Sequence, residues 1–438
     1  MKAFILKQAL NYLEKDPEKN APKLMEWIDN VCPEDWYKGQ RETMRNILVE
    51  KGNWYDFILR IYKLNPEVRK TFFENFFINS CLNGNTRREV IRKQHDCNVP
   101  WAILMDPTSA CNLQCIGCWT AEYGHQLSLD FDTLDSIITQ GKGLGTYVYL
   151  YTGGEPLVRK NDIIRLCEKH PDCEFFAFTN GTLIDEDFCK EMLRVRNFMP
   201  AISLEGFESA NDERRGAGVY QKVVHAMELL KEHKLPFGVS TCYTSKNVDV
   251  VSSEEFFDLI IEHGALFAWF FHYMPVGNAA VTELLPSPEQ RKHLCEKIRH
   301  YRDTKPIFTL DFQNDGEYVG GCIAGGREYF HINANGDAEP CAFIHYSNAN
   351  IKETSLLNVL KSPLFMKYRK HQPFNENLLM PCPMLENPEC LKHMVYSSGA
   401  ISTDYQEPED IDKLCKKCSE YSKHWKPTAD EMWADSHL

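Results

Sequence analysis

The chain has 438 residues, and its 43% hydrophobic and 25% charged content is ordinary for a globular protein of two or three domains. Its formal net charge of −13 argues against non-specific nucleic-acid binding, which depends on a cationic surface. There is no apolar run of about 18 residues that would predict a membrane-spanning helix, and the first residues lack the apolar core of a signal peptide. The 17 cysteines therefore indicate metal ligation in a reducing cytoplasm, not disulfides.

Residues 1–96 are predicted to form a helical module. Apolar residues recur at helical spacing between Phe4 and Leu13 and between Ile47 and Tyr62. The segment 51–96 carries nine Lys and Arg against five Asp and Glu, and it contains Phe72, Phe73, Phe76 and Phe77. Basic and aromatic residues on one helix can form a membrane-interface surface, so we expect the basic face to border the mouth of the next domain. The alternative is an ordinary helix that packs its aromatic rings on that domain.

From residue 97 to about 305, predicted strands alternate with helices. Alternation of this kind implies a parallel sheet, and six units are too few for a closed eight-fold barrel. The predicted fold is therefore α/β, a partial (β/α)6 barrel, with its chemistry at the carboxyl ends of the strands. The six strands are expected at residues 101–106, 147–151, 174–178, 201–204, 237–243 and 266–273.

Three cysteines, Cys111, Cys115 and Cys118, follow the first predicted strand. The segment offers no fourth ligand for tetrahedral zinc, so a [4Fe–4S] cluster with one open iron fits better. Buried structural cysteines are the alternative. The C-x3-C-x2-C pattern resembles the signature of the radical SAM superfamily, which implies that S-adenosylmethionine binds the open iron. Gly117 stands where that family usually has a bulky residue, and Trp119 is expected to cover the cluster or the adenine.

Further motifs end the later strands, and the resemblance implies that they contact S-adenosylmethionine. Gly153-Gly154-Glu155-Pro156 resembles the family motif for its amino group, because glycine lets a ligand approach the backbone. Ser203 and Glu205 match the position that holds the ribose and the methionine end, and Arg215 matches a position that pairs with the carboxylate. Asn180 is expected to contact the substrate or S-adenosylmethionine. We expect Glu155 and Glu205 to act on the cofactor and not on folding; for each residue the alternative is a turn or helix cap.

Residues 306–438 are predicted to form a loop-rich extension. Segments 330–332 and 339–343 flank Asn335-Gly336, a hairpin turn signal. Cys322, Gly336 and Cys341 resemble the opening pattern of the SPASM/twitch extension of the superfamily. This implies one auxiliary iron–sulfur cluster, for which Cys382 and Cys390 are the further expected ligands.

The other cysteines match this pattern less well. Cys415 and Cys418 are either ligands of a second cluster or a surface pair on a helix turn. Eight more are predicted to be structural: Cys32, Cys81, Cys97, Cys167, Cys173, Cys189, Cys242 and Cys295. Acid–base candidates without an assigned role are His272, Tyr273, Asp311, Asp315, Glu317 and His331.

The resemblance implies an anaerobic, cytoplasmic enzyme that receives an electron from flavodoxin or ferredoxin. It would cleave S-adenosylmethionine to methionine and a 5′-deoxyadenosyl radical, which abstracts hydrogen from an unactivated C–H bond. The basic and aromatic helical module suggests a lipid or other hydrophobic substrate and peripheral membrane contact. One alternative is a SPASM-type peptide or protein maturase. The other is a non-enzymatic iron–sulfur electron carrier, which has no need of the strand-end motifs.

Overall fold

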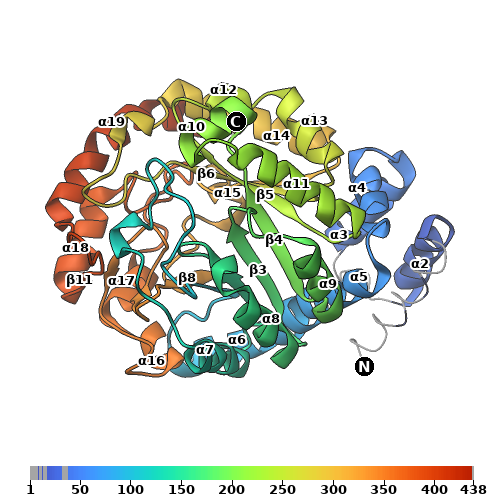
Figure 1. Ribbon diagram of the computed structural model, residues 1–438, viewed down its shortest axis with the longest axis horizontal. Coiled ribbons are helices and arrows are strands. Elements are labelled where there is room, and N and C mark those ends of the chain that lie inside the picture. Colours follow the sequence, from blue (N-terminus) through green and yellow to red (C-terminus); the bar gives the residue numbers. More distant parts are fainter. Residues whose placement is uncertain (1–7, 9–11, 13–16, 32–37, 437–438) are drawn as a thin grey trace.

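The computed structural model describes residues 8, 12, 17–31 and 38–436. Cys32 and most of the predicted helical stretch between Phe4 and Leu13 lie outside these residues. A nine-stranded sheet forms the centre of the protein, in the order β7-β6-β5-β4-β3-β2-β1-β8-β9 (Figure 1). The strands are β1 (Ala102–Met105), β2 (Val148–Tyr151), β3 (Glu174–Thr179), β4 (Phe198–Ser203), β5 (Gly238–Tyr243), β6 (Phe267–His272), β7 (Phe308–Asp311), β8 (Tyr329–Ile332) and β9 (Ala338–Glu339).

All neighbouring strands in this sheet are parallel except β8 and β9. The six predicted strands are all present, so the predicted α/β class is confirmed. The prediction omitted β7, a seventh parallel strand. The predicted hairpin forms as β8 and β9, with Gly336 at φ +94° in its turn, but β8 also pairs with β1, where Tyr329 lies opposite Ala102. The cysteine-rich extension is therefore continuous with the barrel sheet.

Four of the eight α-helices between β1 and β7 begin at side-chain caps, which satisfy backbone N–H groups that have no partner inside the helix. Asp130, Asp185 and Ser253 each accept a hydrogen bond of this kind, and Ser287 forms a capping box with Gln290. Their apolar faces pack on the sheet in the main core. These helices are α7 (Phe131–Leu144), α8 (Lys160–Lys169), α9 (Glu186–Val195), α10 (Glu208–Arg215), α11 (Val219–Glu232), α12 (Val248–Val251), α13 (Glu254–Glu262) and α14 (Pro288–Thr304).

The N-terminal helices close the end of the barrel where the strands begin. Phe57 and Ile61 pack against Ala102, Val148 and Phe267, which are the first residues of β1, β2 and β6. In Figure 1 the first four of these helices lie on the opposite side of the molecule from α18 (Pro388–Ser398) and α19 (Ile411–Ser436), and the last one, α6 (Asn85–His95), lies at the bottom of the view. The N-terminal helices are α2 (Pro17–Val31), α3 (Lys38–Glu50), α4 (Asn53–Tyr62), α5 (Pro66–Phe72), a π-helix (Phe73–Gly84) and α6.

The basic side chains of this module do not border the barrel mouth, so that expectation is wrong. Three of its arginines, Arg60, Arg88 and Arg92, bind backbone carbonyl groups in the loops that lead into the strands. Arg88 donates to the carbonyl of Gly145 before β2, and Arg92 donates to the carbonyls of Val99 and Arg327 before β1 and β8. Loop carbonyls need such donors because no neighbouring strand satisfies them.

The four phenylalanine rings are divided between protein and solvent. Phe72 and Phe76 stack with ring centroids 5.1 Å apart, and Phe76 contacts Trp101 just before β1. Phe77 remains 45% exposed. A ligand bound on these rings would therefore lie at the opposite end of the barrel from the strand-end motifs.

We predict that Arg60→Met detaches this module from the barrel floor. The Arg60 guanidinium donates to the carbonyls of Ile261 and Ala265, at 3.0 and 2.7 Å, and to that of Pro306. Because a hydrogen bond to a charged group contributes about 1.5–3 kcal/mol, the free energy of unfolding should fall by at least that amount. Urea denaturation measures the change. Arg196→Met, which removes a surface ion pair with Glu67, is the control and should change the stability little. Equal stability of the two variants would contradict this prediction.

The C-terminal extension has its own core between α18 and α19. Its helices are α15 (Gly316–Val319), α16 (Leu356–Leu360), α17 (Pro363–His371), α18 (Pro388–Ser398) and α19 (Ile411–Ser436), and a small hairpin pairs β10 (Tyr346–Ser347) with β11 (Ile401–Ser402). Across the described residues, none of the helices combines the length and the apolar character needed to cross a membrane.

Candidate active site

A cavity of about 330 Å³ lies inside the barrel and reaches the carboxyl ends of the strands. This volume is within the range of small-molecule sites. Cys111, Cys115 and Cys118 line it together with the strand-end residues that the sequence singled out. These are Gly153, Gly154, Glu155, Asn180, Ser203 and Arg215. The strand-end residues that the sequence singled out are therefore brought together around one cavity, except Glu205 and Pro156, which are buried and do not line it.

The loop with the three cysteines is held against the loop that follows β2. The backbone N–H groups of Gly154 and Glu155 donate to the carbonyls of Thr108 and Ala110 at 3.0 and 2.8 Å. A Cβ atom on Gly154 would lie 2.2 Å from the carbonyl oxygen of Ala110, and Gly153 has φ +102°. The two glycines are therefore needed for this close contact between loops, whatever their role toward a ligand.

Tyr273 accounts for the glycine at position 117. Gly117 has φ +66°, and a Cβ atom there would lie 2.8 Å from Cε2 of Tyr273 and 3.1 Å from Cδ1 of Leu284. The tyrosine ring thus occupies the space that a bulky residue at 117 would need. Trp119 lines the cavity, and its ring packs against Phe343 at 5.7 Å between centroids.

Glu155 is a structural link as well as a cavity residue. Its carboxylate accepts hydrogen bonds from the N–H of Leu157 at 2.9 Å, the hydroxyl of Thr179 at 2.6 Å and the N–H of Asn180 at 2.7 Å. Burial raises the pKa of Glu155, and these three donors oppose that shift. The expectation that Glu155 does not act on folding is wrong, because it joins the loop after β2 to the end of β3. Through Leu157 it also caps the short 3-10 helix Pro156–Arg159.

Glu205 lies at the centre of a buried charge cluster. Its Oε1 accepts from Nη1 of Arg214 at 2.7 Å and from Nε of Arg215 at 3.0 Å, and its Oε2 accepts from the N–H of Cys242 at 3.0 Å. Its side chain is 0% exposed. The expectation that Glu205 acts only on a cofactor is therefore also wrong. Arg215, expected to pair with a ligand carboxylate, pairs with Glu205, and its Nη1 lies 3.9 Å from the sulfur of Cys115.

Ser203 and Asn180 differ in whether their side chains form hydrogen bonds within the protein. The Asn180 side chain donates to Oδ1 of Asn112 at 2.8 Å, which links β3 to the cysteine loop. Ser203 lines the cavity, and its hydroxyl makes no hydrogen bond to another described residue. It is therefore free to bind a ligand.

The four cysteines expected to hold an auxiliary cluster lie near Tyr368 on α17. Burial raises the pKa of Tyr368 well above its ordinary value, and the charges of Cys322, Cys341, Cys382 and Cys390 raise it further. Its buried hydroxyl has no hydrogen-bond partner among the described residues. The hydroxyl of Tyr329 lies 2.8 Å from the sulfur of Cys341. Four thiols near a tyrosine hydroxyl that lacks a hydrogen-bond partner are compatible with a site for an iron–sulfur cluster.

A cubane cluster requires a different spacing of its thiols from a single metal ion. In the described part of the chain, no three His, Cys, Asp or Glu side chains are grouped closely enough to hold one metal ion. In a cubane cluster each thiolate binds a different iron, so the sulfurs stand apart. The Arg215 guanidinium beside Cys115 suits the negative charge of such a group.

Two family models match the chain. The model of the radical SAM superfamily matches residues 105–260, and that of the SPASM iron–sulfur cluster-binding domain matches residues 322–391. The chain belongs to the radical SAM superfamily. Its cofactors are accordingly a [4Fe–4S] cluster with S-adenosylmethionine in the barrel and auxiliary iron–sulfur chemistry in the SPASM extension.

Relatives of this radical SAM protein have several activities. It is 22% identical over 342 residues to the AdoMet-dependent heme synthase of Methanosarcina barkeri, which covers 71% of this chain and 96% of that protein. It is 25% identical over 288 residues to the PqqA peptide cyclase of Granulibacter bethesdensis, covering 62% and 76%. Streptococcus suis SuiB bound to S-adenosylmethionine has the same fold, with a TM-score of 0.57 at 19% identity over 69% of this chain and 77% of that one. SuiB has also been solved bound to the precursor peptide SuiA.

Most acid–base candidates of this radical SAM protein lie outside the cavity. His272 and Tyr273 line it, whereas Asp311, Asp315, Glu317 and His331 do not. Burial and the neighbouring Asp315 raise the pKa of Asp311 to about 7, but its hydrogen-bond partner is the side chain of Asn314. Asp315 binds Arg302 at 2.6 Å, and Glu317 pairs with Arg299.

His331 lies between two buried carboxylates. Its ring nitrogens are 2.7 Å from Oε2 of Glu339 and 2.9 Å from Oδ1 of Asp106, so both nitrogens are placed to donate. Burial disfavours the charged ring, but Asp106 and Glu339 together raise the pKa of His331 to about 10. This charged cluster joins β1 to the hairpin of the extension.

We predict that His331 makes the stability of the protein depend on alkaline pH. Because its folded-state pKa lies above its ordinary value, its contribution is complete below about pH 6.5 and is lost as the pH rises through about 10. His331→Leu should remove that dependence and destabilise the protein by about 3–5 kcal/mol near neutral pH, because two buried carboxylates lose their cation. Denaturant titrations between pH 6 and 10 provide the measurement. A variant with the same pH slope as the parent would contradict the prediction.

The remaining cysteines follow the prediction only in part. Cys97, Cys167, Cys173, Cys189 and Cys295 are buried as expected, whereas Cys81 is exposed and Cys242 lines the cavity. The radical SAM protein also buries Cys415 and Cys418 between its last two helices, so a surface pair is wrong. Cys415 donates to the carbonyl of Pro388. Sequence reasoning missed Arg214, whose adjacency to Arg215 before Gly216 was its only signal.

Proposed function

We propose that this radical SAM enzyme abstracts a hydrogen atom from an apolar side chain of a peptide or protein. The observation that carries the proposal is the wall of the cavity below the three cysteines. That wall is built from aromatic and aliphatic side chains of the barrel strands: Leu150, Phe178, Trp269, Phe271, Leu310 and Phe312. Such a wall binds an uncharged group and excludes water from a reactive intermediate.

A substrate with several carboxylates fits this cavity less well. The arginines in its described lining are Arg214 and Arg215, and both already pair with Glu205. Binding a polyanion there would require that pairing to be broken. This favours the peptide-modifying relatives over the heme synthase as guides to the substrate.

An apolar cavity by itself would also suit a lipid. The lipid hypothesis depended on a basic helical face at the barrel mouth, and that face lies at the other end of the barrel. The relatives whose names describe peptide or maturase activity support the peptide alternative instead.

We assign the site residues as follows within this proposal. Cys111, Cys115 and Cys118 would hold the barrel cluster, and Ser203 and the glycine loop 153–154 would contact S-adenosylmethionine. When bound there, the two cofactors supply a 5′-deoxyadenosyl radical that takes hydrogen from a C–H bond. Tyr273 and Trp119 shield that space from water, and the Glu205–Arg215 pair holds a positive charge beside Cys115. The auxiliary site would be formed by Cys322, Cys341, Cys382 and Cys390.

The three-part division is also a proposal. Residues 1–96 would close the end of the barrel where the strands begin. Residues 97–305 would form the radical SAM barrel, and residues 306–438 would form the auxiliary-cluster part. β7 and β8 carry the barrel sheet beyond residue 305. Flavodoxin or ferredoxin remains the proposed electron donor.

The test is isotope transfer into 5′-deoxyadenosine. Anaerobically reconstituted protein is incubated with S-adenosylmethionine, dithionite and peptides whose apolar side chains are deuterated. We expect 5′-deoxyadenosine to form and to gain deuterium from a subset of these peptides. Production of no 5′-deoxyadenosine would favour the electron carrier. A parallel incubation replaces the peptides with lipids whose acyl chains are deuterated, and transfer from these alone would favour the lipid substrate.

A further inference from the structure

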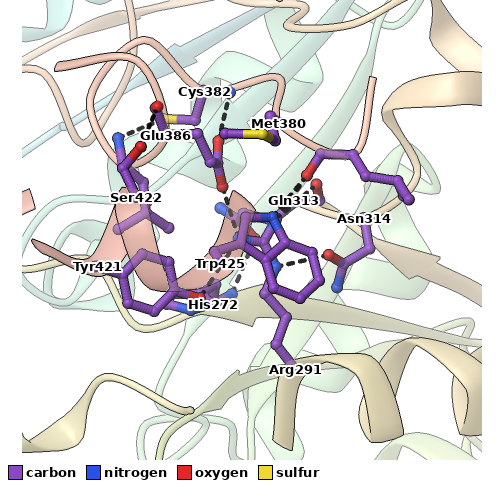
Figure 2. Close-up of polar contacts among 12 residues, drawn as sticks. His272, Arg291, Gln313, Asn314, Met380, Cys382, Glu386, Tyr421, Ser422 and Trp425 are labelled. Atoms are coloured by element: carbon purple, nitrogen blue, oxygen red, sulfur yellow. Dashed lines mark hydrogen bonds and ion pairs between the residues drawn. The ribbon is translucent and has the colours of Figure 1, made fainter. Parts of the chain in front are cut away.

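Arg291 and Glu386 form a buried ion pair between the barrel and the SPASM extension. Arg291 lies on α14, the last barrel helix, and Glu386 lies in the loop before α18. Both side chains are 0% exposed, and Nη1 of Arg291 is 2.7 Å from Oε1 of Glu386. Trp425 of α19 covers the pair, with its ring centroid 4.1 Å from the guanidinium carbon (Figure 2).

The second oxygen of Glu386 binds the backbone of a proposed cluster ligand. Oε2 accepts a hydrogen bond from the N–H of Cys382 at 2.7 Å. Figure 2 shows the Glu386 carboxylate between Cys382 and the guanidinium of Arg291. The orientation of the Cys382 backbone therefore depends on a carboxylate that is itself held by the barrel.

Further contacts also fix the guanidinium. Nε of Arg291 donates to Oδ1 of Asn314 at 2.8 Å, and Nη1 lies 3.4 Å from the hydroxyl of Tyr421. That hydroxyl is 2.6 Å from Nε2 of His272, whose Nδ1 is 2.6 Å from the carbonyl oxygen of Tyr273. A carbonyl only accepts, so Nδ1 of His272 donates to it.

The direction of this hydrogen-bond series follows from the neutral histidine. Burial and the charge of Arg291 lower the pKa of His272, so the ring carries one proton, on Nδ1, and Nε2 accepts from Tyr421. Tyr273 packs over Gly117 in the loop of the first three cysteines. Direct contacts thus connect the loop of Cys118 with Cys382 through Arg291.

Stability alone does not explain such a pair. Two charges lose their hydration on burial, and a well-packed apolar pair of the same shape is often as stable. An apolar pair would, however, leave the N–H of Cys382 without its acceptor. The ion pair instead holds the Glu386 carboxylate in place as the acceptor for the N–H of Cys382.

We propose that Arg291 is a positioning residue for the auxiliary cluster. Through Glu386 it fixes the backbone at Cys382 and so the direction of that thiolate. The inference rests on the proposed function in one respect, that Cys382 is a cluster ligand. It adds that a residue of the barrel, outside the cysteine-rich extension, sets the properties of the auxiliary cluster.

The experiment uses full-length protein in which Cys111, Cys115 and Cys118 are all Ala, so that only the auxiliary cluster contributes. Arg291→Met is compared with Arg299→Met, on the same helix, which loses a pair with Glu317 and a hydrogen bond to the carbonyl of Asn314, neither of which involves a proposed cluster ligand. Iron per chain, the electron paramagnetic resonance spectrum of the reduced cluster and its midpoint potential are measured. We expect Arg291→Met to lose at least half of the iron or to change the spectrum and lower the potential, because an uncompensated carboxylate remains near the cluster. Arg299→Met should match the parent.

A double variant separates positioning from general damage. In Arg291→Met with Glu386→Gln, no buried charge is left unpaired, and the amide oxygen can still accept from the N–H of Cys382. Iron and spectrum should recover toward the parent. If Arg291→Met does not fold by circular dichroism, Glu386→Gln alone carries the test and should raise the potential. Unchanged iron, spectrum and potential in a folded Arg291→Met or Glu386→Gln variant would overturn the inference.

Cys382→Ala distinguishes the two ways in which the idea can fail. If that variant keeps the full cluster, Cys382 is not a ligand and the proposed auxiliary site fails with the inference. If it loses the cluster while Arg291→Met keeps an unchanged one, the ligand assignment stands and only the positioning role is rejected.

Discussion

Replacing Cys111, Cys115 and Cys118 together with Ala is expected to abolish cleavage of S-adenosylmethionine. The three thiols line one cavity at the strand ends, and no other described thiols lie on that loop. The variant should lose the iron of about one cluster, roughly four atoms per chain, and keep the auxiliary signal. Iron analysis and chromatography of 5′-deoxyadenosine provide the measurement.

The control for this variant is Cys81→Ala. Cys81 is an exposed thiol on the N-terminal module, so its loss should leave iron content and cleavage unchanged. Full cleavage activity in the triple variant would refute the assignment of the barrel cluster. Loss of all iron would instead show that the two sites do not assemble independently.

Glu205→Ala is expected to be the most destabilising single substitution near the cavity. It leaves the Arg214 and Arg215 guanidiniums without their carboxylate, and the N–H of Cys242 without its acceptor. Removing one partner of a buried ion pair typically costs about 3–5 kcal/mol, and denaturant titration of the reconstituted protein should show a loss of that size.

The same variant should bind S-adenosylmethionine more weakly. Arg215 lies beside Cys115, and without Glu205 its side chain is no longer held there. Loss of a charged hydrogen bond corresponds to roughly ten- to a hundred-fold in affinity, which calorimetry can measure. Glu205→Gln, which keeps one acceptor oxygen and loses the charge, should fall between the parent and Glu205→Ala. Parent-like stability and binding in Glu205→Ala would contradict both expectations.

These two experiments test different parts of one arrangement. The cysteine variant tests which atoms bind the iron. The glutamate variant tests which group holds the neighbouring charged side chains in place. Both Glu155 and Glu205 link a strand end to the next strand, so the walls of the site and the fold of the barrel share the same hydrogen bonds. A substitution at either position is therefore expected to alter stability and ligand binding together.

Much of the fold and of the site was predictable because the relevant signals are local. The spacing of apolar residues over a few positions predicts each strand and each helix, and this pattern located β1 to β6. The spacing of Cys111, Cys115 and Cys118 and the position of Gly153-Gly154-Glu155 after a strand indicated the cavity that they now line. Parallel strands present their carboxyl ends on one edge, so residues at those ends are brought together by the fold class itself.

Only the tertiary structure decided which groups become partners. No local pattern predicts that Glu205 binds Arg214 and Arg215, that Tyr329 pairs with Ala102, or that Arg60 binds carbonyls on the barrel floor. A buried charge takes whichever donor the packing brings within reach, and that donor often lies far away in the sequence. The sequence by itself therefore determined the superfamily and the strand-end cavity, whereas the packing of distant segments determined which carboxylates are engaged in the fold and where the basic helical face lies.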